Sequence, residues 1–314
     1  MYRQSLELLR ALPPDQFEAA RKIVDLGGNV WQKKPPDDPR VNMIVFSGEQ
    51  FTDAELALLE PFRGKPIRDI AFVNAKVSEA GIVRTLRDFP DQKAVCVTQM
   101  PIGDLALAPL AQFRDLEDVQ FSSTKITSAI LPLIGQQRGL KHLSLGETAV
   151  DDTGFAHLEG LSKLEFLGLN NTIITSAALT SIGKLTNLEI MTLRGTQIDD
   201  DGLKHLTGLK RLRQLDISET KITNAGMVHI AQLSGLDKLT VTNTKVDAKG
   251  VALLQKMPKL KDVDWVDHEK ATLEQKRFHG RFSLDLPANA NLWKDLREQL
   301  QRGEVTIDQL IKSP

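Results

Sequence analysis

Apolar positions along the chain repeat with a period of 24 residues from residue 116 onwards. Each unit opens with the pattern L-x-x-L-x-L and then carries a second apolar run in which every third residue is apolar. The unit from Leu188 to Leu209, LEIMTLRGTQIDDDGLKHLTGL, contains both parts. Self-similarity of this length is typical of folds built from stacked repeats. The leucines that open successive units form one arithmetic series: Leu116, Leu140, Leu164, Leu188, Leu212, Leu236 and Leu260.

Within each unit the periodicity changes from that of a strand to that of a helix. Met191 and Leu193 alternate with Thr192, as side chains alternate across a strand. Further along, Leu203 and Leu206 recur at a helical spacing. The position before each helix is always Thr or Asp, whose side-chain oxygens suit a helix N-cap. The predicted caps are Thr127, Asp151, Thr175, Asp199, Thr223 and Asp247.

One such unit is too small to bury its apolar face alone, so consecutive units must stack. Strands pack about 4.8 Å apart and helices about 10 Å apart, which bends the stack toward the strand side. We therefore predict an α/β fold, a right-handed horseshoe-shaped solenoid. Its concave face would be a parallel β-sheet, and its convex face would carry short α-helices.

The alignment extends upstream into degenerate units at 41–66, 67–91 and 92–115, so that residues 41–265 contain nine full coils and a final strand. Pro109 and Pro132 fall inside expected helices, where proline removes a backbone hydrogen bond, so we predict short or irregular helices there.

Both ends of the chain are predicted to be helical caps. Residues 3–26 have a helical apolar pattern that Pro13-Pro14 divides and Gly27-Gly28 ends, so residues 1–40 form an N-terminal cap over the exposed sheet edge. After Trp265 the pattern predicts two or three further helices. Residues 266–314 are therefore either a C-terminal cap or a docking segment.

The repeat also carries a family resemblance. The segment from Thr220 to Met227, TKITNAGM, resembles the T-x-[IV]-T-D-x-G-L repeats of bacterial leucine-rich-repeat proteins. It is similar as well to ribonuclease-inhibitor-like repeats and to the cysteine-containing repeats of F-box substrate receptors, with threonine in place of cysteine. The resemblance spans residues 41–265, about seven tenths of the chain. It implies a protein-interaction scaffold, or alternatively a substrate-recognition or adaptor subunit that docks through its C-terminal helices.

A second threonine recurs just after each strand, where other leucine-rich repeats have asparagine. A hydroxyl can donate to one carbonyl and accept from one amide, so we predict a structural hydrogen-bond ladder and no role in chemistry. Its members are Thr124, Thr148, Thr172, Thr196, Thr220 and Thr244.

A partner site on the inner face would centre on Phe166 and Ile190, which occupy adjacent coils at a position that points away from the core. Binding elsewhere on the chain, or no specific binding on this face, are the alternatives. An apolar pair with a charged rim is typical of protein interfaces, although scattered exposed apolar side chains are also common. The predicted rim comprises His142, Glu147, Arg194, Asp216 and Glu219.

Catalytic and metal-binding patterns are weak. The sequence lacks G-x-S-x-G, H-E-x-x-H, P-loop and G-x-G-x-x-G motifs, so we predict no enzyme and no cofactor. His157, His205 and His229 share one position on the outer helices, but zinc needs three or four ligands and no second ligand type recurs there. Cys96 and His142 lie about two coils apart, too far for a nucleophile and its base.

The composition is typical of a soluble protein, and the chain has no strong net electrostatic field, because 40 basic residues balance 41 acidic ones. This argues against nucleic acid as a partner, and no stretch of 18 apolar residues could span a bilayer. The first residues lack the apolar core of a signal peptide, and Cys96 is the single cysteine. We expect a cytoplasmic monomer with a protein partner, or an exported protein if Met1 is not the natural start.

Overall fold

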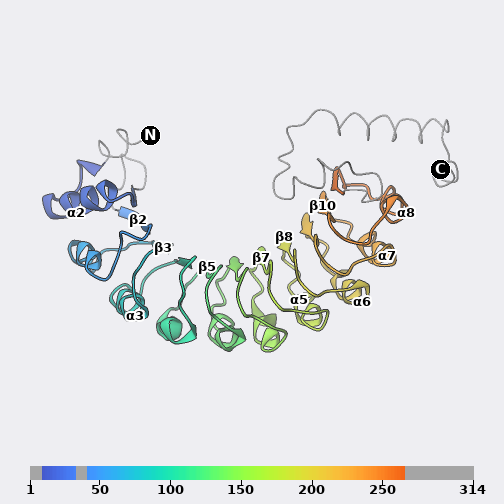
Figure 1. Cartoon of the computed structure of the whole chain (residues 1–314), viewed down its shortest axis with the longest axis horizontal. Helices are drawn as coiled ribbons and strands as arrows, with labels where there is room; N and C mark the ends of the chain where they lie inside the picture. The colour runs from blue at the N-terminus through green and yellow to red at the C-terminus, as the bar shows by residue number, and fades with distance from the viewer. Residues whose placement is uncertain (1–8, 33–40, 266–314) are drawn as a thin grey trace.

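The computed structural model describes residues 9–32 and 41–265. They form one sheet of eleven strands, in which each strand pairs with the next along the chain. Figure 1 shows the strands along the inner side of an arc and the helices along its outer side. The predicted α/β horseshoe, with its sheet on the concave face, is confirmed.

Ten of these strands are parallel and delimit nine coils, as the repeat alignment predicts. The early strands are longer than the later ones, which have three residues each. The parallel strands are β2 (Val41–Ser47), β3 (Asp69–Val73), β4 (Ala94–Thr98), β5 (Asp118–Gln120), β6 (His142–Ser144), β7 (Phe166–Gly168), β8 (Ile190–Thr192), β9 (Gln214–Asp216), β10 (Lys238–Thr240) and β11 (Asp262–Asp264).

The strand register follows the sequence alignment even through the degenerate early coils. Ile44 pairs with Ile70, which pairs with Val95, and all three are at most 1% exposed. The middle residue of β2 and of each three-residue strand from β5 to β10 enters the core between sheet and helices, as do the second and fourth residues of β3 and β4. The residues that alternate with them point to the concave face.

The convex side consists of short helical segments, many of them 3-10 helices. Pro109 lies within a 3-10 helix, and Pro132 lies in the first turn of a four-residue α-helix that follows a 3-10 turn, so both predicted irregularities are confirmed. The segments are η1 (Glu55–Phe62), α3 (Glu79–Asp88), η2 (Asp104–Gln112), η3 (Ser128–Ile130), α4 (Leu131–Ile134), η4 (Phe155–Gly160), α5 (Leu179–Ile182), α6 (Asp200–Leu203), η5 (Lys204–Leu206), α7 (Met227–Ile230) and α8 (Ala248–Ala252).

All six predicted capping side chains accept from a backbone amide, but only Thr127, Asp199 and Asp247 stand at the N-cap of a helix. Asp151, Thr175 and Thr223 lie in the turn before η4, α5 and α7, which begin four residues later. Thr175 Oγ1 accepts from the amide of Ala177 at 3.2 Å, and Asp199 Oδ1 accepts from the amide of Gly202 at 3.3 Å. The equivalent atoms of Thr127, Asp151, Thr223 and Asp247 accept from backbone amides in the same way.

Coils capped by threonine alternate with coils capped by aspartate, and the two kinds are joined differently. Asp152 accepts from both the amide and the hydroxyl of Thr175 on the next coil, at 2.7 and 2.6 Å. Ser176 in turn donates to Asp199 Oδ1 at 2.6 Å and accepts from the Asp199 amide at 3.0 Å. The hydrogen-bonded unit is therefore two coils, twice 24 or 48 residues. The same contacts join Asp104 to Thr127, Ser128 to Asp151, Asp200 to Thr223 and Asn224 to Asp247.

The second threonine series bonds within its own coil. Thr196 Oγ1 donates to the carbonyl of Leu193, three residues earlier, at 2.6 Å. Thr124, Thr148, Thr172, Thr220 and Thr244 make the equivalent bond. These hydroxyls close the turn after each strand instead of forming a ladder between coils, because the carbonyl three residues back lies within reach of the short side chain.

The N-terminal segment contains a strand that the sequence did not predict. Helix α2 (Pro14–Asp25) begins after Pro13 and ends at Gly27, whose φ of 91° suits glycine, as expected. Strand β1 (Asn29–Gln32) then pairs antiparallel with β2 and covers the edge of the sheet. Four residues, NVWQ, are too few to show alternation, so their pairing with β2 decides their conformation.

The described chain ends just after the last strand. Trp265 Nε1 donates to the carbonyl of Val246 at 2.8 Å and is partly buried against the core. The predicted helical segment at 266–314, with its role as a cap or docking module, lies outside the described residues, as do residues 1–8 and 33–40.

Candidate interaction surface

Two rows of side chains run across the concave face. Neighbours within a row are directly paired strand residues, so their side chains project to the same side. The first row is Met43, Asp69, Ala94, Asp118, His142, Phe166, Ile190, Gln214, Lys238 and Asp262, and the second is Val45, Ala71, Cys96, Gln120, Ser144, Gly168, Thr192, Asp216, Thr240 and Asp264.

Phe166 and Ile190 are directly paired at the centre of the first row. Both are half-buried, because the curvature of the sheet crowds neighbouring side chains. The His142 ring lies 6.4 Å from the Phe166 ring, measured between centroids and tilted by 54°. Gly168 makes room for the aromatic ring, since a Cβ at that position would lie 3.2 Å from Phe166 Cε1. The structure thus brings together three of the predicted site residues.

The other predicted rim residues make local contacts beside this pair. Arg194 Nη2 donates to Glu219 Oε1 at 2.7 Å, and the two side chains are about one-third to two-fifths exposed. Asp216 Oδ1 accepts from the hydroxyl of Ser218 at 2.6 Å. Glu147 lies further toward the N-terminus, where it accepts from Ser123 at 2.7 Å. Arg194 and Glu219 therefore form a pair, whereas Asp216 and Glu147 are held by serines.

Three polar atoms, two to four residues further along the chain from Phe166 or Ile190, are buried without a hydrogen-bond partner. They are Asn170 Oδ1, Thr192 Oγ1 and Arg194 Nε. A buried polar group that lacks a partner costs free energy, about 1–3 kcal/mol for each one. Sequence reasoning named Arg194 but missed Asn170 and Thr192, because nothing in the repeat pattern shows which hydroxyl or amide finds a partner.

The N-terminal end of the face carries a buried carboxyl group. Asp69 is 8% exposed, and its Oδ1 has no hydrogen-bond partner. The pKa of Asp69 is raised to about 7, mainly by burial and also by the charge of the nearby Asp118, while Arg68 acts in the opposite direction. Burial and the charge of Asp69 likewise raise the pKa of the Cys96 thiol to about 12. The repeat pattern does not predict the burial of Asp69, because this position is polar in most coils.

Trp31 is an exposed aromatic residue that the sequence analysis missed. It pairs with Met43, a member of the first row, and is 54% exposed, whereas its neighbour Val30 pairs with Ile44 in the core. The indole therefore extends the first row beyond β2. Its placement depends on β1, which no repeat pattern predicts.

The concave rows are acidic although the whole chain is nearly neutral. Among their twenty positions, the only Lys or Arg is Lys238, against five carboxylates, so the rows carry a formal charge of 1 − 5 = −4. The whole chain has a net charge of −1. The carboxylates belong to Asp69, Asp118, Asp216, Asp262 and Asp264.

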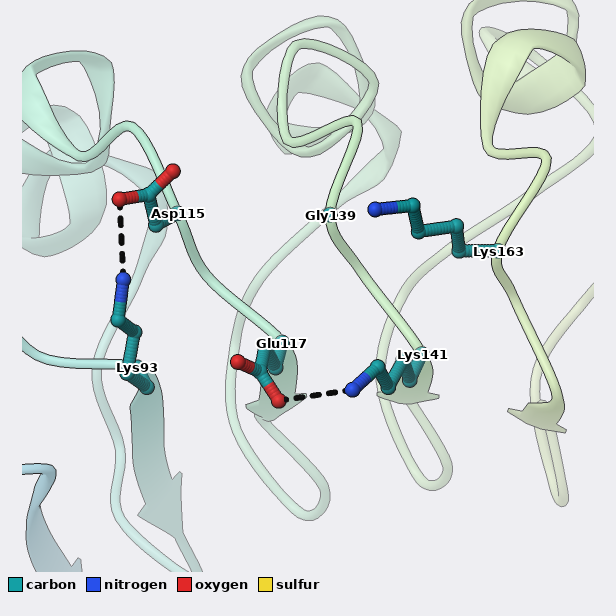
Figure 2. A pocket seen from close by; sticks show the side chains of 6 residues that line it. All are labelled: Lys93, Asp115, Glu117, Gly139, Lys141 and Lys163. Carbon is teal, nitrogen blue, oxygen red and sulfur yellow. Dashed lines mark hydrogen bonds and ion pairs between the residues drawn. The ribbon is translucent and has the colours of Figure 1, made fainter.

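A charged cleft of about 250 Å³ lies where the chain enters strands β4 to β6 (Figure 2). Lys93 Nζ lies 2.9 Å from Asp115 Oδ2, and Lys141 Nζ lies 3.1 Å from Glu117 Oε2, so each of these lysines pairs with an acid. Gly139 and Lys163 complete the lining. These ion pairs join residues that lie just before neighbouring strands, at the end where the chain enters the sheet.

The described residues offer little reactive chemistry. Across 9–32 and 41–265, no group of three or more His, Cys, Asp or Glu side chains is arranged to hold a metal ion. Cys96 and His142 belong to β4 and β6, which β5 separates, and the Cys96 Sγ lies 3.9 Å from Gln120 Oε1. With a pKa of about 12 the thiol stays protonated at neutral pH, and a protonated thiol is a poor nucleophile. In the same part of the chain, no helix has both the length and the apolar character needed to cross a membrane.

The parallel strands, the convex helices and the 24-residue period define a leucine-rich-repeat solenoid. Among solved structures, an internalin (InlF) of Listeria monocytogenes matches with 22% identity and a TM-score of 0.54, over 68% of this chain and 57% of its own. Internalin C2 of the same bacterium matches with 18% identity and a TM-score of 0.51, over 81% of this chain and 93% of its own. At these identities the likeness shows the fold alone. No family model and no curated protein matches the sequence.

Proposed function

We propose that this protein is a non-enzymatic scaffold that binds a protein partner on its concave face, centred on Phe166 and Ile190. The observation that carries the proposal is the direct pairing of an aromatic and an aliphatic side chain, both half-buried on the concave face, with the Arg194–Glu219 ion pair on the coils of β8 and β9. An apolar centre with charged residues at its margin is typical of protein interfaces.

The energetics favour a protein surface as the ligand. Covering the exposed parts of Phe166 and Ile190 removes apolar area from water, which contributes about 25 cal/mol for each Å². Aromatic and arginine side chains at the centre of an interface tend to dominate binding energy.

Affinity capture with three versions of the full chain tests this proposal. The wild type is compared with Phe166→Ala/Ile190→Ala and with Val228→Ala, a control that removes an apolar side chain 53% exposed on α7. We expect a partner retained by the wild type and the control to be lost with the double variant, at an affinity loss of roughly tenfold to a thousandfold. A partner that all three versions retain equally would place its binding elsewhere.

The finer expectations from the sequence stay predictions. We expect a monomer in the cytoplasm. We also expect no nucleic acid as a partner, because the acidic concave rows would repel a phosphate backbone. Sedimentation of the purified chain measures its oligomeric state. Docking through residues 266–314 is tested by comparing capture with the intact chain and with residues 1–265.

A further inference from the structure

We propose that the N-terminal half of the concave face, strands β2 to β6, binds a basic protein segment, with a lysine or arginine of that segment forming an ion pair with Asp69. The inference deepens the proposed concave-face binding and rests on it, since it names the chemistry of the partner at one end of the same surface.

Charge complementarity is the first argument. The ten row positions on β2 to β6 include Asp69 and Asp118 but no lysine or arginine. Nearby cations form ion pairs with other acids just before the strands begin: Arg68 lies 3.8 Å from Glu117, and Lys93 lies 2.9 Å from Asp115. This half of the face therefore presents negative charge that Arg68 offsets only in part.

The environment of Asp69 is the second argument. It is more than nine-tenths buried, and its Oδ1 has no hydrogen-bond partner. Its neighbours on the face are Ala94, paired directly across, and Ala71, two residues along the strand. Their methyl groups carry no donor, so they cannot satisfy the carboxylate. A carboxylate in such surroundings costs free energy unless a cation or donor joins it.

Apolar surface next to the carboxylate suits the stem of a long basic side chain. Met43 pairs with Asp69 on one side, and the exposed indole of Trp31 follows Met43 in the same row. Lysine and arginine pack their methylene stems on apolar surface while the charged end reaches a polar group. On the other side, Asp118 accepts from Gln120 at 3.1 Å and lies 3.8 Å from His142 Nδ1, which leaves it able to attract a second cation.

A matched pair of peptides tests the inference on the full-length chain. One is an acetylated and amidated heptapeptide of alternating arginine and leucine, and the other replaces each arginine by citrulline, its neutral isostere. Binding is measured by fluorescence anisotropy at pH 8, and alanine-methyl NMR signals locate the site. We expect the arginine peptide to shift the methyl signals of Ala71 and Ala94 and to bind roughly tenfold more tightly than the citrulline peptide.

Variants of the chain provide the second arm. Asp69→Asn should weaken binding of the arginine peptide roughly tenfold, and Asp118→Asn should weaken it less. Asp262→Asn, at the other end of the same row, is the control and should change the affinity by less than about twofold. Equal affinities for the two peptides overturn the inference. So does an unchanged affinity in Asp69→Asn, or a response confined to alanines beyond β8.

The outcome is separable from that of the capture experiment. If the peptide pair shows no preference while Phe166→Ala/Ile190→Ala still loses a partner, the basic-segment inference fails alone. If the peptides discriminate as expected but the double variant retains every partner, the proposed centre of binding fails alone.

Discussion

Replacing Asp69 by asparagine should make the protein more stable at neutral and alkaline pH and should change the pH dependence of its stability. Asparagine has nearly the same shape as aspartate but carries no charge. The wild-type carboxyl is 8% exposed with an unpartnered oxygen, so its ionised form is poorly solvated in the folded chain. The asparagine variant removes this penalty and keeps the packing.

The magnitude follows from the pKa. Burial raises the pKa of Asp69 from its ordinary value of 3.8 to about 7, so the folded chain holds this proton more tightly than the unfolded chain. The stabilisation from the bound proton is full below pH 3.8 and is lost as the pH rises through about 7. A difference of about 3 pH units corresponds to roughly 4 kcal/mol, at about 1.4 kcal/mol for each unit.

Urea denaturation of both proteins between about pH 4.5 and 8.5 measures this effect. The free energy of unfolding of the variant minus that of the wild type should rise by about 1.4 kcal/mol per pH unit up to about pH 7 and then stay level. Taking the difference removes the groups common to both proteins. Arg68 immediately before β3, Cys96 on β4 and the Asp118–His142 pair on β5 and β6 lie near Asp69 and are unchanged.

Two results would refute the reasoning. A difference that does not vary with pH means that the Asp69 carboxyl is hydrated in the folded chain and titrates near its ordinary value. A variant that is less stable than the wild type at pH 8 means that the ionised carboxyl makes a favourable contact within this chain. In that case the charge would not be free to bind a partner.

Three further predictions concern the coils and the thiol. Leu193→Ala, at the fully buried position just after β8, should lower the free energy of unfolding by about 2–5 kcal/mol, whereas Thr192→Ala on the concave face should change it by less than about 1 kcal/mol. Equal losses in urea denaturation would contradict the assigned facing of these side chains. Asp152→Ala removes both hydrogen bonds to Thr175 and should cost about 1–2 kcal/mol, while Asp152→Asn, which keeps one acceptor, should cost less. The pKa of Cys96 is about 12 against an ordinary 9.0, so the folded chain holds far less of the reactive thiolate at pH 8. Cys96 should therefore react with iodoacetamide about a thousandfold more slowly in the folded than in the unfolded chain. Similar rates would show an accessible thiolate.

Much of the interaction surface could be predicted from the sequence, because residues 24 positions apart become neighbours on adjacent strands. The adjacency of Phe166 and Ile190 follows from a spacing of 24 residues, and the register confirms it. The position of Arg194 beside Glu219 follows in the same way. What the period could not give is the state of each polar atom. Asp69 and Asp118 occupy equivalent positions, yet only Asp69 is buried with an unpartnered oxygen. Its neighbours Met43, Ala94 and Ala71 carry no side-chain donor, whereas Asp118 has Gln120 and His142 close by.

The hydrogen bonds between neighbouring coils likewise could be predicted only in part. The alternation of threonine and aspartate at the caps is visible in the sequence, and so is their suitability for capping. That Asp152 reaches forward to Thr175 while Ser176 reaches forward to Asp199 appears only when the coils are stacked. The type of each side chain determines whether it can donate or accept a hydrogen bond. The offset between stacked coils determines which residues form the bond.

The sequence by itself determined the solenoid, its strand register and the facing of its side chains, because every coil repeats the same local pattern of burial. The tertiary structure alone decided the pairing of β1, the exposure of Trp31 on the concave face and the burial of Asp69. These features depend on what lies one coil away or on an unrepeated segment, and a periodic pattern carries no information about either. The physical reason is that periodicity fixes which side of a strand faces the core, whereas burial of the other side depends on the size and charge of its particular neighbours.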